Sequence, residues 1–218
     1  MLAPNLSAVA CTAALAAFAA VAAWPPLAGA LVLERSRLSA EPWRLLTGHW
    51  THWSADHLIW NVLVFGALGA LMELRSRARF LACIVVSALA ISAALVVLQP
   101  QVAHYRGLSG IDSALFAAVV VALLHDALAA GRWRTASCLV LAFAGLLAKI
   151  VFESTTGRLL FVDAAAFTSV PLVHAVGAMV GVVIALVPVP GRARAAAQAR
   201  ERDRFVPAVS ASRTSQAS

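Results

Sequence analysis

The chain has 218 residues, of which 61% are apolar and only 12% are charged, and its mean hydropathy is +0.85. A soluble globular domain carries roughly 25% charged residues, so this composition excludes an ordinary soluble protein. It predicts an all-α, polytopic membrane protein. The formal net charge of +7 comes almost entirely from arginine in loops and in the C-terminal region. This pattern favours contact with anionic lipid over binding of nucleic acid.

Six apolar segments follow one another along the chain, each close to the ~20 residues that a helix needs to cross a bilayer. The first lies within residues 1–33, which contain no Asp, Glu, Lys or Arg. No basic residue precedes Leu6, so we expect a retained helix and not a cleaved signal peptide. The other segments cover residues 57–72, 80–99, 109–125, 135–151 and 171–189. We therefore predict a six-helix transmembrane domain over residues 1–190 and a basic, disordered cytoplasmic tail over residues 191–218.

The distribution of arginine predicts how the segments are oriented. Loops rich in Lys and Arg tend to stay in the cytoplasm. Arginines are concentrated after the second segment, after the fourth segment and in the tail after Gly191, and fewer lie in the loops between them. Both termini are thus predicted to be cytoplasmic, in a bacterial inner membrane. With this orientation the second, fourth and sixth segments all begin in the outer leaflet.

Polar residues with catalytic potential lie at the start of those three segments. His57 begins the second, Ser109 begins the fourth, and His174 lies in the first turn of the sixth. A serine hydroxyl becomes a nucleophile when a neutral imidazole takes its proton, so Ser109 and His174 are predicted to form a catalytic dyad. Asn61 follows His57 by one helical turn on the same face. We expect both to stabilise an oxyanion, together with the free backbone N–H groups at the helix start.

Four glycines are expected to support this site. Gly107 permits a tight approach into the helix, and Gly110 leaves room for a substrate backbone beside the nucleophile. In the sixth segment, Gly177 and Gly181 form a small-xxx-small face that allows close approach to a neighbouring helix. If that neighbour is the fourth segment, the two dyad residues come together.

The remaining candidate ligands do not indicate a metal site. The three cysteines stand singly in apolar stretches and provide neither a disulfide framework nor paired zinc ligands. His49, His52 and His57 are close in sequence, but carboxylates are sparse around them. We expect no metal.

Together these residues give the chain a resemblance to the rhomboid intramembrane serine proteases. The resemblance covers residues 43–185. The matching features are Trp43-Arg44 in a long first loop, His52, His57-x-x-x-Asn61, Gly107-x-Ser109-Gly110 and His174-x-x-Gly177-x-x-x-Gly181. It implies a six-helix bundle and a serine endopeptidase that cleaves single-span membrane proteins near the outer leaflet. It also implies that Ser109 is the nucleophile, that His174 is the general base and then the acid, and that no cofactor takes part.

Within the family, the compact six-helix form and the run from Trp43 to His52 are most similar to the rhombosortase branch. That similarity implies exported substrates with a C-terminal sorting tail made of a Gly-Gly motif, a hydrophobic helix and a basic end. The alternative is a noncatalytic rhomboid-like protein that binds or remodels transmembrane segments. The presence of both Ser109 and His174 favours the protease, because a binding module does not need this pair.

The chain departs from the family pattern one turn after the nucleophile. Many rhomboids have a tyrosine there that stacks on the catalytic histidine, whereas this chain has Ser113. Either another group supports His174 or the geometry of the site differs. Asp112 is also an unusual charge at this position, and we expect it to face an aqueous cavity or to orient a hydrogen-bond donor.

Overall fold

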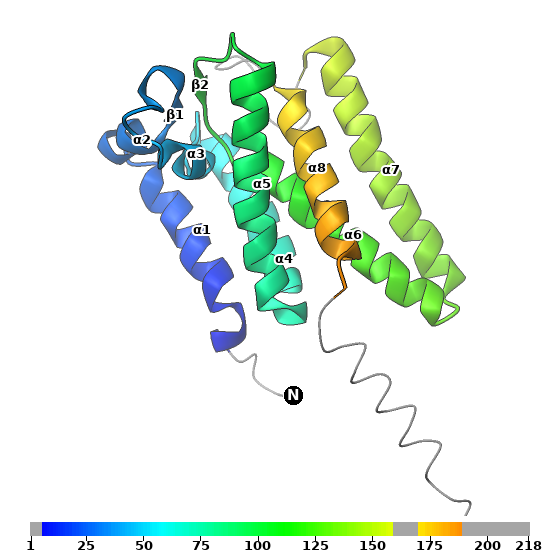
Figure 1. Cartoon of the computed structure of the whole chain (residues 1–218). Helices are drawn as coiled ribbons and strands as arrows, with labels where there is room; N and C mark the ends of the chain where they lie inside the picture. Colours follow the sequence, from blue (N-terminus) through cyan, green and yellow to red (C-terminus); the bar gives the residue numbers. More distant parts are fainter. Residues whose placement is uncertain (1–5, 159–169, 189–218) are drawn as a thin grey trace, which may run out of the picture. The chain divides into compact units, whose positions relative to one another are not determined.

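The computed structural model describes residues 6–158 and 170–188 (Figure 1). The chain divides into a compact unit, Met1–Leu186, and a second unit, Val187–Ser218. The predicted tail at 191–218 lies outside the described residues, so its disorder stays a prediction. The compact unit is helical, which confirms the all-α prediction, and each strand that the structure describes has only two residues.

Four helices in the described part of the chain are long and apolar enough to cross a membrane, so the protein is an integral membrane protein. They are α4 (Ala55–Arg75), α5 (Arg77–Leu98), α6 (Ser109–Ala129) and α7 (Trp133–Thr156). Another helix, α8 (Pro171–Leu186), is apolar but shorter. Counting a bent helix pair near the N-terminus raises the number of candidate spans to five. Six crossings therefore stay a prediction.

The first apolar segment is broken, although the sequence predicted a single helix. A short 3-10 helix, η1 (Leu6–Val9), leads into α1 (Ala10–Ala22), and α2 (Pro25–Leu31) follows after a bend of 108°. Pro25 has no N–H with which to continue the helix, and a residue before proline is pushed out of the helical region. Trp24 accordingly has an extended backbone, with φ −63° and ψ 124°.

The long first loop is folded and fastened to the end of α5. It contains β1 (Leu33–Glu34), η2 (Arg35–Arg37), α3 (Arg44–Thr47) and η3 (Gly48–Trp50). The guanidinium of Arg35 donates to the carbonyl oxygens of Val96 and Gln99 at 2.9 and 3.0 Å, at the end of a helix where the last carbonyls have no intrahelical partner. β1 also pairs antiparallel with β2 (His104–Tyr105). The loop therefore fixes the segment that leads into α6.

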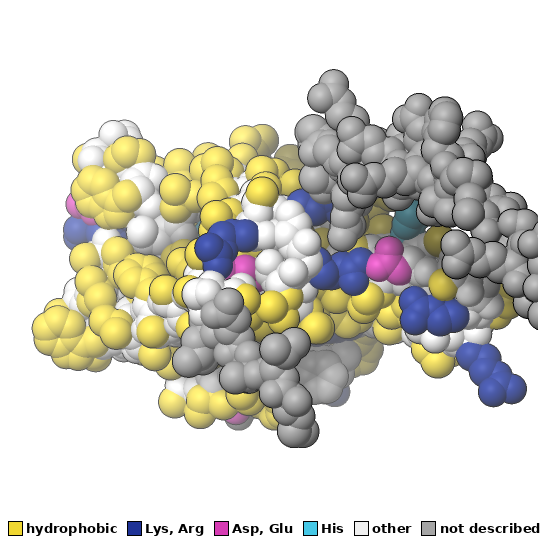
Figure 2. Space-filling view, turned by 90° about the horizontal axis from the view of Figure 1, so that it is seen from below, with side chains coloured by type: hydrophobic (Ala, Val, Ile, Leu, Met, Phe, Trp, Pro, Cys, Tyr) yellow, Lys and Arg dark blue, Asp and Glu magenta, His cyan; other side chains and the backbone are white. Residues whose placement is uncertain are grey.

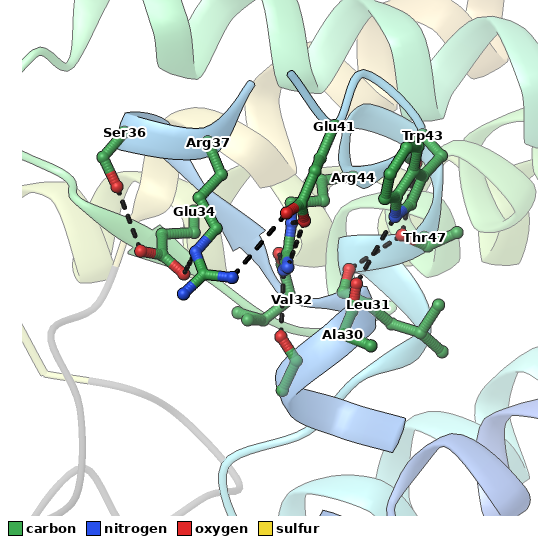
Figure 3. A network of polar contacts seen from close by, with 11 residues as sticks. Ala30, Leu31, Val32, Glu34, Ser36, Arg37, Glu41, Trp43, Arg44 and Thr47 are labelled. Atoms are coloured by element: carbon green, nitrogen blue, oxygen red, sulfur yellow. Dashed lines mark hydrogen bonds and ion pairs between the residues drawn. The ribbon is translucent and has the colours of Figure 1, made fainter. Parts of the chain in front are cut away.

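A buried arginine holds the first loop together (Figure 3). Arg44 is only 1% exposed, and its guanidinium donates to the carbonyl oxygens of Val32 at 2.7 Å and Gly29 at 3.0 Å. The same guanidinium forms an ion pair with Glu41. In addition, the Thr47 hydroxyl donates to the carbonyl oxygen of Leu31 at 2.8 Å. These bonds join α2 to α3, so this part of the first loop is structural.

Small residues bring α6 and α8 into backbone contact in the centre of the bundle. A Cβ added to Gly177 would lie 1.9 Å from the carbonyl oxygen of Gly110, and one added to Gly181 would lie 2.0 Å from that of Ala114. Both distances are far shorter than van der Waals contact, so only glycine fits at either position. Among the four long helices, α6 is the most buried and α7 the least.

Basic side chains gather at the end of the bundle where α4 meets α5 and α6 meets α7. Figure 2 looks onto this end and shows Lys and Arg side chains across the face. The arginines at these helix ends are Arg75, Arg77, Arg79, Arg132 and Arg134. Two of these arginines form ion pairs with carboxylates: Arg75 pairs with Asp126, and Arg77 pairs with Glu73 at 3.0 Å. Glu73 also accepts a hydrogen bond from the Thr12 backbone N–H at 2.8 Å and so caps α1.

Candidate active site

A cavity of about 1290 Å³ lies among helix ends on the other side of the bundle from the arginines. Its walls come from the N-terminal parts of α4, α6 and α8, the stretch of α7 from its middle to its end, and the segment between α5 and α6. The lining includes His57, Asn61, Ser109 and His174. The structure thus brings together the four residues that the sequence singled out, although they come from three separate helices.

The backbone before Ser109 has a conformation that glycine favours. Ser109 is the first residue of α6, and Gly107 has a φ of +129°, which side-chain-bearing residues rarely adopt. A Cβ on Gly107 would lie 2.8 Å from the His57 ring and 3.9 Å from Asn61 Nδ2. Gly107 therefore allows both the turn into α6 and the close approach of the two oxyanion candidates.

Tyr105 fixes the same turn from inside the protein. It is 5% exposed, and its hydroxyl donates to the carbonyl oxygen of Gly107 at 2.9 Å. Burial raises the pKa of Tyr105, and a hydrogen bond with the Ser109 side chain acts in the opposite direction. The pairing of β1 with β2 holds Tyr105 at this position next to Ser109.

His57 and Asn61 are positioned by the start of α4. Ser54 caps this helix by accepting a hydrogen bond from the His57 backbone N–H at 3.1 Å. Asn61 follows one turn later, and its Nδ2 is buried with no hydrogen-bond partner among the described residues. The amide is therefore a donor that a ligand in the cavity can use. His57 is also close enough to His174 for an electrostatic interaction between the two rings.

His174 has a carboxylate partner that the sequence analysis missed. Its Nδ1 lies 2.8 Å from Oε2 of Glu153, near the end of α7. Lys149, one turn earlier on α7, lies 2.8 Å from Glu153 and 3.4 Å from His174 Nδ1. We expected the fifth apolar segment to end at residue 151, which left Glu153 outside it. Two opposite charges spaced i, i+4 in an apolar helix were the available signal, because intramembrane charges are costly and usually functional.

The side chain of Ser113, at the position where many rhomboids have tyrosine, is hydrogen-bonded within α6. Its hydroxyl donates to the carbonyl oxygen of Ser109 at 2.8 Å, within its own helix. Of the two alternatives that the sequence left open, support of His174 by another group is the one seen in the structure, and that group is Glu153. Asp112 lines the cavity, and neither of its carboxylate oxygens has a hydrogen-bond partner among the described residues.

Gly110 has a packing role that the sequence did not predict. A Cβ there would lie 2.7 Å from the end of the Ile91 side chain and 3.0 Å from the carbonyl oxygen of Val173. The small size of Gly110 therefore serves the packing of α6 against α5 and α8, and its role beside a substrate backbone stays a prediction. Since Val173 precedes His174, the same contact holds Ser109 and His174 on adjoining helix ends.

The first-loop histidines are packed within the fold. His49 Nε2 lies 3.0 Å from both the Ala88 carbonyl oxygen and Ser92 Oγ. Burial lowers the pKa of His49 to about 4 and that of His52 to about 3. Within residues 6–158 and 170–188, no group of three or more His, Cys, Asp or Glu side chains is placed to hold a metal ion.

The chain matches the model of a known protein family. A protein-family model described as Rhomboid domain matches residues 39–190, which is more than half of the chain. The matched region contains α4 to α8 and therefore every helix that lines the cavity. A search of curated proteins found no match.

Proposed function

Because the chain belongs to the rhomboid family, whose members are generally serine intramembrane proteases, we propose that it cleaves transmembrane segments with Ser109 as nucleophile and His174 as general base. The observation that carries this proposal is the cavity that both side chains line. They lie at the starts of α6 and α8, where the absence of a side chain at Gly177 lets the two helix backbones come into contact beside Gly110.

The chemistry follows the order of a serine protease. Ser109 Oγ attacks the carbonyl carbon of the scissile peptide while His174 Nε2 takes the hydroxyl proton. The imidazolium then returns this proton to the leaving amide nitrogen, and the peptide bond breaks. A water molecule, deprotonated by the same imidazole, hydrolyses the acyl-enzyme. Polar groups such as Gln101 and His104 in the cavity wall support the access of water.

Oxyanion stabilisation is assigned to groups that surround the start of α6. Ser109 is the first residue of the helix, where backbone N–H groups have no intrahelical acceptor and the helix dipole is positive. The unpartnered Nδ2 of Asn61 supports a direct role as a donor, and the contact of His57 with Gly107 places its ring beside the same turn. Removal of one such donor costs ~10²–10³ in rate.

The cavity is assigned to the outer leaflet. The arginines of the α4–α5 and α6–α7 connections lie at the other end of the bundle, as the positive-inside tendency requires of a cytoplasmic face. Cleavage would then occur near the external surface of a bacterial inner membrane, with both termini of the chain in the cytoplasm. The partners in this proposal are the lipid bilayer and single-span membrane proteins.

The first test uses an active-site label. A fluorophosphonate probe should label the purified protein in detergent or liposomes at Ser109, and the protein should cleave a model transmembrane substrate. Ser109→Ala should abolish both activities. Ser154→Ala is the matched control, because that hydroxyl is exposed on α7 and bonded within its own helix at 2.7 Å. Unlabelled, inactive but folded protein would favour the noncatalytic alternative, and full cleavage by Ser109→Ala would refute the dyad.

A second test addresses the substrate class. The similarity of the run from Trp43 to His52 to rhombosortases supports exported substrates with a Gly-Gly sorting tail. Two single-span substrates that share a hydrophobic helix and a basic end, one with Gly-Gly and one with Leu-Leu before the helix, should differ at least tenfold in kcat/KM. Equal cleavage of both would indicate a general rhomboid protease.

A further inference from the structure

We propose that Glu153 is a positioning residue for His174, so that catalysis depends on a carboxylate, an imidazole and a hydroxyl acting in series. The inference rests on the proposed function, because it gives Glu153 a role only if His174 is the base. Its geometric basis is the 2.8 Å separation of Glu153 Oε2 from His174 Nδ1.

The contact selects one tautomer of the imidazole. A neutral imidazole carries one N–H, and a carboxylate only accepts hydrogen bonds. The short contact with Glu153 therefore places the N–H of His174 on Nδ1, and the lone pair lies on Nε2. Nε2 is then the nitrogen that accepts the proton of Ser109. Without the carboxylate, either nitrogen can carry the hydrogen, and one of the two forms has no lone pair on Nε2.

Lys149 makes a buried carboxylate possible at this position. Glu153 is 0% exposed and His174 is 4% exposed, and an ionised carboxylate in such a place needs a compensating charge. The Lys149 ammonium lies 2.8 Å from each of the two Glu153 oxygens. Its separation from His174 Nδ1 is longer, 3.4 Å, so its hydrogen bonds go to the carboxylate. Lys149 thus supplies the counter-charge of the Glu153 carboxylate while His174 bonds to it.

The placement of Glu153 on α7 supports a specific role. In this 24-residue helix only Ala136 and Glu153 are buried. Most of the surface of α7 is not buried in the protein, yet the Glu153 carboxylate is buried and contacts the imidazole of His174. The glutamate is also the second cavity-lining charge of α7 after Lys149. Packing alone does not require a charge there.

In the reaction, the carboxylate stabilises the cation that forms. When Nε2 takes the proton of Ser109, His174 carries an N–H on both nitrogens, and the Nδ1–H remains bonded to Glu153. Glu153 does not take up the proton, which passes from Nε2 to the leaving nitrogen. Its negative charge lies beside the imidazolium and lowers the energy of the tetrahedral state relative to the ground state.

The test is Glu153→Gln, which keeps the size of the side chain and removes its charge. The assay measures kcat and KM on the model transmembrane substrate in liposomes, per folded molecule. In the Ser-His-Asp template the equivalent substitution lowers kcat by ~10⁴-fold, so we expect a loss of ~10²–10⁴-fold in kcat with KM changed by less than about threefold. A loss smaller than tenfold in kcat, or a KM change that accounts for the loss, overturns the proposal.

Glu73→Gln is the matched control for the loss of a buried carboxylate. Glu73 is equally buried in its side chain and pairs with an i+4 cation, Arg77, but it lies at the opposite end of the bundle. The Glu73→Gln variant should lose stability and keep the kcat of the wild-type protein. If both glutamine variants lose kcat equally, the effect is a general one on the fold and the proposal fails.

A second variant covers the case in which Glu153→Gln does not fold because Lys149 loses its counter-charge. The double variant Glu153→Gln, Lys149→Met removes both charges and is compared with Lys149→Met alone, again with a tenfold loss in kcat as the criterion. The result is independent of the dyad test. Activity retained by Ser109→Ala overturns the proposed function itself, whereas an inactive Ser109→Ala with fully active glutamate variants overturns only the role of Glu153.

Discussion

The contact between α6 and α8 can be tested with a single methyl group. In Gly177→Ala the new Cβ would lie 1.9 Å from the carbonyl oxygen of Gly110, whereas ordinary contact begins at about 3.4 Å. The obstructing atom belongs to the backbone, so the helices must separate by about 1.5 Å. Overpacking of this kind costs about 1–3 kcal/mol in unfolding free energy. A misplacement of about 1 Å between reacting groups costs ~10²-fold in rate, so labelling of Ser109 by a fluorophosphonate should slow by at least that factor.

Gly66→Ala provides the control for this prediction. Gly66 is also within a membrane helix, α4, and a Cβ there would meet nothing within 4 Å. The substitution should be neutral or stabilise the protein by about 0.5–1 kcal/mol, because alanine is the better helix former. Thermal unfolding in detergent and the labelling rate are measured for both variants. If Gly177→Ala unfolds at the wild-type temperature and labels at the wild-type rate, the backbone contact does not hold the two catalytic candidates together.

Two further predictions concern the first loop. Arg44→Ala leaves the buried carbonyls of Val32 and Gly29 without their donor and should lower the free energy of unfolding by about 3–5 kcal/mol. Arg44→Lys should recover only part of this stability, since an ammonium lacks the planar fork of the guanidinium. A loss below about 1 kcal/mol for Arg44→Ala in a thermal unfolding assay would contradict the structural role. Because burial lowers the pKa of His49 from 6.5 to about 4, the unfolded chain takes up a proton between these pH values that the folded chain does not. The free energy of unfolding should therefore fall on acidification through this window, by on the order of 3 kcal/mol for this residue, and a His49→Gln variant that shows an equally steep fall in pH-dependent melting would exclude His49 as the source.

The sequence predicted the helices well wherever hydrophobicity alone decides them. Charge-free runs locate α4 to α8 because an ionised group in a bilayer is costly, and polar residues and glycines mark their starts. Ser109 as the first residue of α6 was predicted in this way. The sequence also contains the cause of the break before Pro25, because proline interrupts a helix and pushes the residue before it out of the helical region. A search for charge-free segments does not show this break, since proline adds no charge.

Other features depend on which segments meet, and no local pattern reports that. The sequence determined that a hydroxyl and an imidazole begin separate apolar helices, and that small residues follow the imidazole at a spacing suited to close packing. Only the tertiary structure decided that this glycine face contacts α6, that Gly110 is needed for packing, and that Tyr105 holds the turn before Ser109. It also decided that Glu153 of α7 is the partner of His174. The physical reason is that periodicity and charge fix which side of a helix tolerates lipid, whereas the partner of a buried polar atom depends on the packing of helices that are distant in sequence.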